Sequence, residues 1–556
     1  MSVQYGAWIG NVLVRKWKID HHAEEDFHSR GIGVGKVMPL TLTERFLRGL
    51  ELSPDRPAVR IGSDSVSYQR VHKTALRWAG SLMANGSPRS VGVLAGKSTT
   101  AYVGLLAVLY AGATVVPLQP NFPAALIRRM IKLAGVDTLI ADEHGLAVLP
   151  EIIDQETGIR VLDTGSFAEK FPKIPVTSHP EISMPVKVTP SDRAYILFTS
   201  GSTGVPKGVP LSHGGFAHYF DLLDKRCDFR SDDVFSQTFD LNFDCGVHDV
   251  FSAWGAGATV QVVPPSAYRD LPAFLAEHRV TVWYSTPSAI WLAREMGGLE
   301  KGALASLRWS FFAGEALRCQ DAADWQVAAA GSKVENLYGP TEFTINITWH
   351  RWLGEESEKR GVNGTVPIGK IHEAHDFRLV TEQGEQSHVE GELWITGPQM
   401  ATGYLDPADE EGRFADLDGR RWYRTGDRVR ANPDGELSYI GRLDSQVKVH
   451  GWRVELAEVD HLVRDCDGVH NAVTVTRSVI HGTELVVFYT GNEVPESALA
   501  DGLRAVLPDS ILPRRYVHLD NFPLNSNRKV DRLALRQWAE KLPGSSEASS
   551  GVGMRD

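Results

Sequence analysis

The sequence predicts an α/β protein in which a large N-terminal domain with largely parallel sheets flanked by helices is followed by a small, mobile α+β domain. Three observations favour this fold class. At 556 residues the chain is longer than a single hydrophobic core usually organises. Short apolar strand-like segments alternate with amphipathic helical ones, which is typical of βαβ units. Beyond about Gly391 this alternation gives way to closely spaced strands separated by Gly and Asp turns.

The alternation can be followed residue by residue from Pro39. LTERFLRGL is an amphipathic helix, and two short strands, AVRIG and SVSY, precede the helical VHKTALRWAGSLMANG. SVGVLAG, TTAYVGLLAVLYAGA and TVVPLQP then predict strand, helix and strand, and LIRRMIKLAG with VDTLIAD repeats the unit. The C-terminal part combines the helices AEVDHLVRD and ESALADGLRAVL with the strands NAVTVTRS and TELVVFYT.

These segments divide the chain into four parts. We expect an N-terminal extension of unknown role (1–37), a large core (38–443), a small C-terminal domain (444–542) and a tail (543–556). The tail, GSSEASSGVGMRD, has too little apolar content to fold and is expected to be disordered.

Composition excludes several kinds of partner. The net charge of −11 and the scattered basic residues argue against nucleic acid. The apolar stretch Ala7 to Val14 is too short and too polar to span a membrane or to direct export, so we expect neither. Four widely separated cysteines form no zinc or disulfide pattern, which fits a cytoplasmic protein.

The most distinctive stretch is TSGSTGVPKG, residues 199–208. Its glycines and small hydroxyl residues let backbone N–H groups point into one concavity, to which Lys207 adds a further donor, and this combination suits a polyphosphate. It differs from the Walker pattern because Gly208 follows the lysine where Ser or Thr is needed. A flexible linker is the alternative, but the strand-like AYILF before it favours a phosphate loop.

Further motifs follow in order: NLYGPTE (336–342), GELWITGPQMATGY (391–404), YRTGD (423–427), GRLDSQVKVHGWRVEL (441–456) and NRKVDR (527–532). Together with the phosphate loop, this series resembles the adenylate-forming superfamily over residues 39–542. That superfamily includes acyl-CoA synthetases, luciferases and the adenylation domains of nonribosomal peptide synthesis. The resemblance implies ATP and Mg²⁺ as cofactors, and a carboxylate that attacks the α-phosphate of ATP.

The resemblance assigns the nucleotide to particular residues. Thr341 is expected to contact the α-phosphate, and Glu342 to hold Mg²⁺, which prefers oxygen ligands. Tyr338 is expected to stack near adenine. The other expected nucleotide-binding residues are Thr199, Ser200, Gly201, Ser202, Thr203, Gly204 and Lys207 in the phosphate loop, Gly314, Glu315 and Ala316 along the base, and Asn336 and Gly339 in NLYGPTE.

Three residues after position 420 carry further expectations. Asp427 matches the acceptor for both ribose hydroxyls, with Arg442 beside it, although Asp is also common in turns. Lys529 matches the catalytic lysine that stabilises developing charge, whereas a lone lysine is usually a surface charge. Arg528 stands where the family usually has Gly, which leaves the local loop shape open. Asp444 matches the hinge about which the small domain swings, and an ordinary interdomain turn is the alternative.

The stretch FDLNFDCGVHDVFSAW bears on the acid that is activated. Matched to the family's pocket segment, Asp244 stands where amino-acid-activating members carry the aspartate that pairs with the substrate ammonium. A buried carboxylate without a cation is costly, so such a pocket selects an amine; a helix N-cap is the alternative role. The resemblance places the rest of the pocket at Cys245, His248, Tyr284, Phe311, Ala313, Leu337, Ile345 and Asn346.

These side chains predict a small amino acid as substrate, with proline first and alanine, serine or another small amino acid next, since the pocket resembles that of prolyl-activating enzymes. The segment VKVHGWRVELAEV also resembles the corresponding segment of D-alanine-carrier protein ligases. No G-G-x-S attachment motif follows Lys529, so we expect the enzyme to load the phosphopantetheine arm of a separate carrier protein in natural-product biosynthesis. An acyl- or aryl-CoA ligase and a catalytically silent scaffold are the two alternatives.

Overall fold

The structure is a computed structural model. It describes residues 39–84, 86–153, 158–164, 172–176, 181–200, 206–443, 446–449, 452–479, 482–504, 507, 512–525 and 529–542. All of these residues belong to one unit of mutually contacting segments, Pro39–Asp556. The predicted N-terminal extension, the tail and the hinge residue Asp444 lie outside the described residues, so the four-part division of the chain stays a prediction.

The first sheet has seven strands in the order β7-β6-β5-β3-β4-β8-β9, parallel except for the antiparallel pair β8 and β9. Its strands are β3 (Ser90–Leu94), β4 (Thr114–Leu118), β5 (Thr138–Ala141), β6 (Arg160–Asp163), β7 (Lys173–Pro175), β8 (Arg193–Ser200) and β9 (Pro206–Ser212). Alternate residues of β3 join different hydrophobic clusters: Val93 packs with α2 (Tyr68–Met83) and α3 (Thr99–Tyr110), and Leu94 packs with α4 (Ala124–Ala134) and α5 (Glu143–Ile152). Both faces of the sheet are therefore covered, as a parallel sheet requires.

The second sheet has nine strands in the order β16-β15-β14-β13-β12-β10-β11-β1-β2, and the run from β14 to β1 is parallel. Its strands are β1 (Pro57–Ile61), β2 (Asp64–Ser67), β10 (Val234–Gln237), β11 (Thr259–Val262), β12 (Val282–Ser285), β13 (Trp309–Phe312), β14 (Lys333–Tyr338), β15 (Thr348–Arg351) and β16 (Lys370–Ile371).

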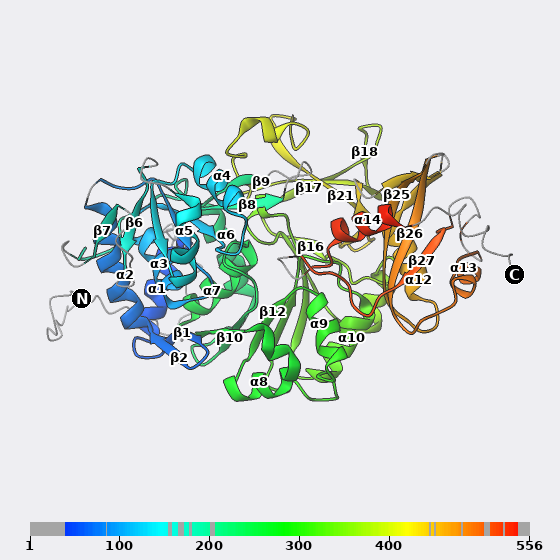
Figure 1. Ribbon diagram of the computed structural model, residues 1–556, viewed down its shortest axis with the longest axis horizontal. Helices are drawn as coiled ribbons and strands as arrows, with labels where there is room; N and C mark the ends of the chain where they lie inside the picture. The colour runs from blue at the N-terminus through cyan, green and yellow to red at the C-terminus, as the bar shows by residue number, and fades with distance from the viewer. Residues whose placement is uncertain are drawn as a thin grey trace, which may run out of the picture. The chain divides into compact units, whose positions relative to one another are not determined.

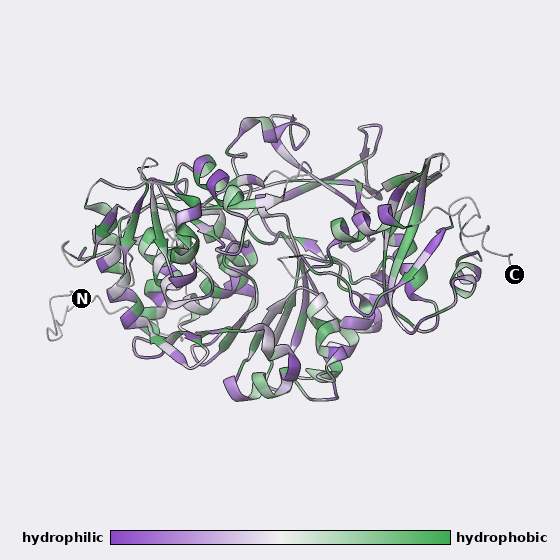
Figure 2. Cartoon of the chain, viewed as in Figure 1, coloured by the Kyte–Doolittle hydropathy of each residue, from purple (hydrophilic) through white to green (hydrophobic). Residues whose placement is uncertain are grey.

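Helices cover this second sheet too. One face packs against α8 (Leu271–His278), α9 (Ser288–Glu295) and α10 (Cys319–Ala328), where Trp283 of β12 meets Trp325. The other face shares one hydrophobic cluster with the first sheet, built from α1 (Leu42–Leu52), α6 (His213–Arg226), α7 (Asp244–Ala256) and α3. The strands of both sheets carry mostly apolar residues, while the covering helices show both colours (Figures 1 and 2).

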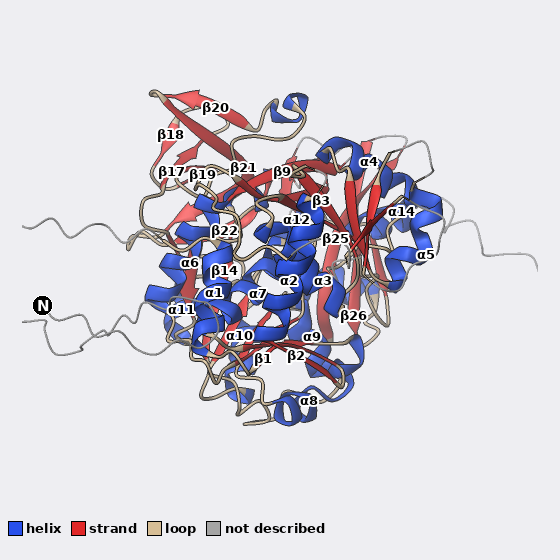
Figure 3. Ribbon diagram, turned by 90° about the vertical axis from the view of Figure 1, so that its left-hand side faces the viewer, coloured by secondary structure: helices blue, strands red, loops and turns tan. Residues whose placement is uncertain are grey.

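The remaining strands form smaller, mainly antiparallel sheets. Figure 3 shows one of them projecting at the upper left, and it contains β17 (Asp376–Val380), β18 (Gln386–Ser387), β19 (Glu390–Thr396), β20 (Phe414–Leu417), β21 (Arg420–Ala431) and β22 (Leu437–Arg442). The others are the pair β23 (Gln446–Val449) and β24 (Trp452–Glu455), and the sheet of β25 (Val469–Val479), β26 (Gly482–Gly491) and β27 (Arg515–His518). Helices α11 (Glu355–Arg360), α12 (Leu456–Arg464), α13 (Glu496–Arg504) and α14 (Arg532–Lys541), and the 3₁₀ turns η1 (Pro265–Asp270), η2 (Thr341–Phe343) and η3 (Pro407–Glu410), complete the described elements.

The predicted fold class is confirmed: the protein is α/β with mostly parallel sheets, followed by a separate C-terminal set of strands and helices. Local sequence explains where elements begin. Thr41 and Glu44 form a reciprocal capping box at the start of α1, and Ser98 caps α3. Among the described helices, none combines the length and the apolar content that a bilayer crossing needs.

Candidate functional site

A cavity of about 550 Å³ lies at the carboxyl ends of the parallel strands of the nine-stranded sheet. Ligands commonly bind at this edge in α/β proteins. Most of the predicted site residues line it: Thr199, Asp244, Cys245, Ala313, Gly314, Glu315, Ala316, Asn336, Leu337, Tyr338, Gly339, Thr341, Asn346, Asp427, Arg442 and Lys529. Segments far apart in the sequence, from three sheets and from the loop before α14, therefore meet in one pocket.

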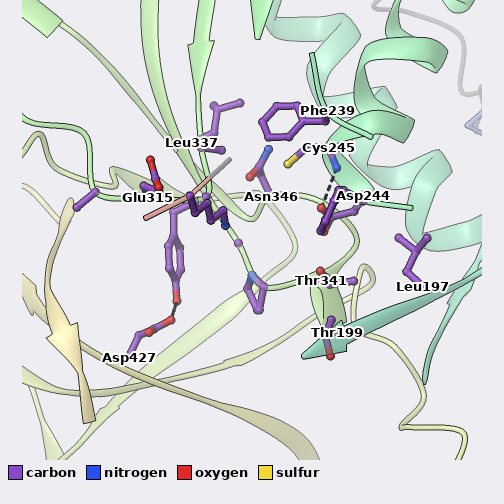
Figure 4. Close-up of a pocket in the computed structure, with 18 of the residues that line it drawn as sticks. Leu197, Thr199, Phe239, Asp244, Cys245, Glu315, Leu337, Thr341, Asn346 and Asp427 are labelled. Atoms are coloured by element: carbon purple, nitrogen blue, oxygen red, sulfur yellow. Dashed lines mark hydrogen bonds between the residues drawn. The ribbon is translucent and has the colours of Figure 1, made fainter. Parts of the chain in front are cut away.

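Asp244 marks one end of this pocket. It is the first residue of α7, and Phe243 is the N-cap, so Asp244 does not take the capping position considered above. Its side chain is only 7% exposed, and Oδ1 accepts a hydrogen bond from the N–H of Cys245 at 2.8 Å, drawn as a dashed line in Figure 4. Burial raises the pKa of this carboxyl group, while a hydrogen bond to Thr341 and the charge of Lys529 oppose the rise. The site thus holds a carboxyl group that a cationic ligand would stabilise.

Polar side chains close the pocket beyond Asp244. The hydroxyl of Tyr284 donates to Sγ of Cys245 at 3.2 Å, and Nδ2 of Asn346 donates to the same hydroxyl at 3.1 Å. Phe239, Cys245, Leu337 and Asn346 lie on one side of the pocket in Figure 4. These mutually hydrogen-bonded side chains form a wall that closes this end of the pocket.

Four residues predicted to line the substrate pocket do not reach its surface. His248 and Phe311 are fully buried, and Tyr284 and Ile345 are 1% exposed. The physical reason is the wall just described, since the ring of His248 packs against Tyr284 at 4.5 Å behind it. Nδ1 of His248 is 2.7 Å from the hydroxyl of Tyr219, and burial lowers the pKa of His248 to about 3, so its ring is neutral.

The opposite end of the pocket contains Asp427. Oδ2 accepts a hydrogen bond of 2.5 Å from the hydroxyl of Tyr338, and Oδ1 lies 3.1 Å from a guanidinium nitrogen of Arg442. Asp427 and Arg442 face each other in the register of β21 and β22. Two fixed partners leave this carboxylate oriented toward the pocket, and the charge of Asp427 contributes to raising the pKa of Tyr338, after burial itself.

Lys529 enters the pocket from the segment before α14. Its Nζ lies 3.0 Å from the point where a Cβ on Gly314 would stand, so a side chain at position 314 would crowd the ammonium group. The backbone of Lys529 is held by Asn525: the N–H of Asn525 donates to the carbonyl of Lys529 at 2.8 Å, and Oδ1 of Asn525 accepts from the N–H of Lys529 at 3.1 Å. Arg528, the unusual neighbour, lies outside the described residues.

The phosphate loop is described only at its margins. Thr199 lines the pocket, whereas Gly201, Ser202, Thr203 and Gly204 lie outside the described residues, as does the side chain of Ser200.

Two predicted residues lie beside the pocket and not on its surface. Nζ of Lys207 lies 3.4 Å from a carboxylate oxygen of Asp409 and 5.2 Å from the ring centre of Tyr404. The hydroxyl of Tyr404 donates to Oε1 of Glu342 at 2.5 Å. Tyr404 therefore lies between the two predicted charges, and both belong to the same corner of the site.

Glu342 fits the chemistry of a Mg²⁺ ligand, because Mg²⁺ is commonly bound through one or two carboxylates together with substrate phosphates and water. Its carboxylate is 6% exposed. Among the residues that the structure describes, no cluster of three or more His, Cys, Asp or Glu could hold a metal without such help. The donor set therefore suits an ion that arrives with a nucleotide.

Sequence reasoning missed part of the lining. Phe239, Asn242 and Phe243 belong to the stretch that yielded Asp244, and their position after β10 was a usable signal. Phe122, Leu126 and Met130, which come from α4 and the turn before it, carry no local signal, because an apolar helix face that lines a pocket looks the same as one that packs in a core. The other lining residues outside the predicted set are Leu197, Phe198, Pro206, Pro340, Thr365, Val366, Ile368 and Tyr439.

Comparison with known proteins adds independent findings. The family model described as "AMP-binding enzyme" matches residues 46–405. An L-proline--[L-prolyl-carrier protein] ligase of Pseudomonas fluorescens is 31% identical over 512 residues, which cover 90% of this chain and 99% of that protein. A dimodular nonribosomal peptide synthase of Bacillus subtilis is 31% identical over 540 residues, 94% of this chain, but the chain spans only 22% of its length.

Solved structures give the same picture. The crystal structure of IdnL7 is 55% identical, with a TM-score of 0.83, and the match covers 90% of this chain and 98% of that one. The adenylation domain AlmE of Vibrio cholerae, in complex with glycyl-adenosine-5'-phosphate, is 28% identical with a TM-score of 0.66, and the match covers 92% of this chain and 99% of that one.

Proposed function

The chain belongs to the family of AMP-binding enzymes, and we propose that it adenylates a small amino acid with ATP and then passes the aminoacyl group to the phosphopantetheine arm of a carrier protein. Membership makes it an AMP-forming ligase of the adenylate-forming superfamily that uses ATP. The amino acid and the acceptor are the proposed part.

The observation that carries the proposal is the buried carboxyl group of Asp244 at one end of the pocket. An isolated buried carboxylate is costly, and its pKa is raised accordingly. An ammonium group of an amino acid would offset this cost, whereas an acyl or aryl acid brings no cation to this position. Asp244 therefore favours amino acids over the acids of CoA ligases.

The size of the amino acid follows from the wall behind Asp244. Cys245 and Asn346, both bonded to the hydroxyl of Tyr284, limit the room for a side chain. Proline is our first candidate, with alanine, serine and other small amino acids next. The similarity to a prolyl-carrier-protein ligase supports proline, and the similarity to an adenylation domain solved with glycyl-adenosine-5'-phosphate supports a small substrate.

The nucleotide would occupy the other end of the pocket. Asp427 would accept hydrogen bonds from the ribose hydroxyls with Arg442 beside it, and Tyr338 with Gly314, Glu315 and Ala316 would flank the base. Thr341 and Lys529 both lie near Asp244, where the amino acid carboxylate and the α-phosphate would meet. Glu342 would hold Mg²⁺, which when bound neutralises phosphate charge.

The acceptor is proposed from relatives. The prolyl ligase is matched over 99% of its length and is named for transfer to a carrier protein, so a partner of that kind is expected here. The hinge role of Asp444 and the division into a large and a small domain belong to the same proposal.

The test is a pyrophosphate-exchange panel over amino acids, imino acids and common aryl and acyl acids, with Asp244→Asn as a paired variant. Exchange that depends on one or a few small amino acids supports the proposal. Exchange driven by acyl or aryl acids would favour a CoA ligase, and no exchange with any acid would favour a catalytically silent scaffold. Loading of a phosphopantetheinylated carrier protein, followed by mass spectrometry, tests the second step.

A further inference from the structure

A strained turn connects two parts of the pocket. Thr344 has φ 51° and Ile345 has φ 79°, both in the left-handed region that β-branched residues rarely adopt. Both residues are only 1% exposed. Such a conformation persists only where the surroundings over-determine it, so the surroundings of this turn need to be identified.

Gln399 supplies most of these surroundings. Its Nε2 lies 3.0 Å from the carbonyl oxygen of Phe343, 3.1 Å from that of Thr344 and 2.9 Å from that of Asn346. In return, the hydroxyl of Thr344 donates to the backbone carbonyl of Gln399 at 2.8 Å. Gln399 comes from the segment after β19 and is 1% exposed, so it contacts the turn from a distant part of the sequence.

The orientation of the Gln399 amide is fixed by its partners. Carbonyl oxygens only accept, so the NH₂ group must face the turn and Oε1 must face away from it. Oε1 lies 3.2 Å from Nδ1 of His372, a neutral ring because burial lowers the pKa of His372 to about 3. His372 therefore carries its proton on Nδ1 and donates a hydrogen bond to Oε1 of Gln399. This bond fixes the orientation of the amide.

The turn matters because its two ends are in the pocket. Thr341 precedes it and is hydrogen-bonded to Asp244, and Asn346 ends it and donates to Tyr284. Gly339 lies directly against it, with a would-be Cβ 2.6 Å from Cα of Asn346. A change in the turn would thus displace Thr341 and Asn346 together. Asp427 and Arg442 pair with each other at the other end of the pocket.

We propose that Gln399 is a positioning residue for the amino acid end of the site. It holds the strained turn 343–346 in the one conformation in which Thr341 and Asn346 face Asp244, and it thereby sets the KM for the amino acid and the discrimination among amino acids, without acting on ATP. The kinetic part of this inference rests on the proposed function, while the structural part does not.

The kinetic experiment compares Gln399→Leu, which removes every side-chain hydrogen bond to the turn, with Met400→Leu as a matched control in the same segment. Gln399→Leu is expected to raise the KM for the preferred amino acid about tenfold and to broaden the range of amino acids used, with the KM for ATP changed less than about twofold. Equal rises in both KM values, or no rise in either, would overturn the proposal.

A second-site variant separates positioning from general loss of packing. Glycine adopts positive φ without strain, so Thr344→Gly in the Gln399→Leu background is expected to lower the raised amino acid KM again. If Gln399→Leu fails to fold, Gln399→Asn, whose amide is one methylene short of the three carbonyls, takes its place with the same expected rise. A double variant no better than the single one counts against the role of strain.

Hydrogen exchange followed by mass spectrometry tests the structural part without any substrate. The peptide covering 341–346 is expected to exchange faster in Gln399→Leu than in the unsubstituted chain or in Met400→Leu. Unchanged exchange in this peptide overturns the proposal whatever the enzyme activates. Faster exchange in a protein that adenylates no amino acid would support the structural role of Gln399 and reject the proposed function.

Discussion

Tyr338 and Asp427 join two sheets across the pocket by a hydrogen bond of 2.5 Å. Tyr338 ends β14 of the nine-stranded sheet, and Asp427 lies in β21 of the antiparallel sheet. The same carboxylate also faces Arg442, so its position depends on residues from three strands.

Removal of the tyrosine hydroxyl tests what this bond does. A hydrogen bond to a charged group contributes about 1.5–3 kcal/mol. Tyr338→Phe is therefore expected to raise the KM for ATP about tenfold or more and to leave the KM for the amino acid nearly unchanged. Steady-state pyrophosphate exchange with each substrate varied in turn measures both. A rise only in the KM for the amino acid would contradict the assignment of Asp427 as the acceptor for the ribose hydroxyls.

Asp244→Asn keeps the shape of the side chain and removes its charge. Breaking a buried ion pair costs about 3–5 kcal/mol, so amino-acid-dependent exchange is expected to fall by about 100-fold or more. Asp240→Asn is the matched control, because Asp240 belongs to the same stretch and its Oδ1 lies 3.5 Å from Nζ of Lys97. Equal activity in the two variants would show that Asp244 does not pair with the substrate.

Lys529→Ala is expected to lower the rate of adenylation about 100-fold, the scale of a lost contact to developing charge. Lys541→Ala removes an exposed lysine at the end of α14 and is expected to change nothing. Single-turnover formation of the aminoacyl-adenylate is the measurement. Near-normal rates in Lys529→Ala would leave the lysine as a surface charge that happens to line the pocket.

Gly339→Ala tests the close approach of two backbone segments. An added Cβ would stand 2.6 Å from Cα of Asn346 and 2.7 Å from the carbonyl oxygen of Ile345, and neither can move alone. We expect loss of adenylation and a lower melting temperature. Gly331→Ala, whose Cβ would meet nothing nearer than 4.0 Å, is expected to behave as the unsubstituted chain in both assays.

The buried histidines predict a loss of stability in acid. Burial lowers the pKa of His213 and His375 to about 4 and that of His248 and His372 to about 3. Since these pKa values lie below the unfolded value of 6.5, the stability they contribute is complete above pH 6.5. It is lost as the pH falls from 6.5 to about 4 for His213 and His375 and to about 3 for His248 and His372, because the unfolded chain then binds more protons.

The size of this effect can be measured with one variant. Each such histidine lowers the free energy of unfolding by about 2 kcal/mol at pH 5 relative to pH 7. Between pH 7 and pH 5, the free energy of unfolding of His375→Gln is therefore expected to fall by about 2 kcal/mol less than that of the unsubstituted chain. Urea unfolding at several pH values measures the slope, and parallel slopes would contradict the assignment.

Much of the fold could be predicted because its signals are local. Strands such as Ser90–Leu94 are continuous apolar runs, and helices such as Leu42–Leu52 show both an apolar stripe and a cap. Long-range contacts had no such signal: nothing near Gln399 in the sequence indicates that its amide contacts residues 343–346.

The depth of the substrate pocket could not be predicted for a related reason. His248 and Phe311 occupy matching positions in the family's motif, yet whether a side chain reaches the cavity depends on what stands in front of it. Here the bonds of Tyr284 to Cys245 and Asn346 decide this, and such bonds join residues that are 39 and 62 positions apart.

The pocket draws its lining from separate sheets, and this has a consequence for how such a protein can diverge. The residues around Asp244 follow strands of the nine-stranded sheet, Thr199 lies near the end of a strand of the seven-stranded sheet, and Asp427 belongs to the antiparallel sheet. Substitutions in 239–248 and at Leu337 and Asn346 can therefore accumulate while the frame around the nucleotide is inherited unaltered. One scaffold can in this way supply a lineage of enzymes that share a reaction and differ in the acid they accept.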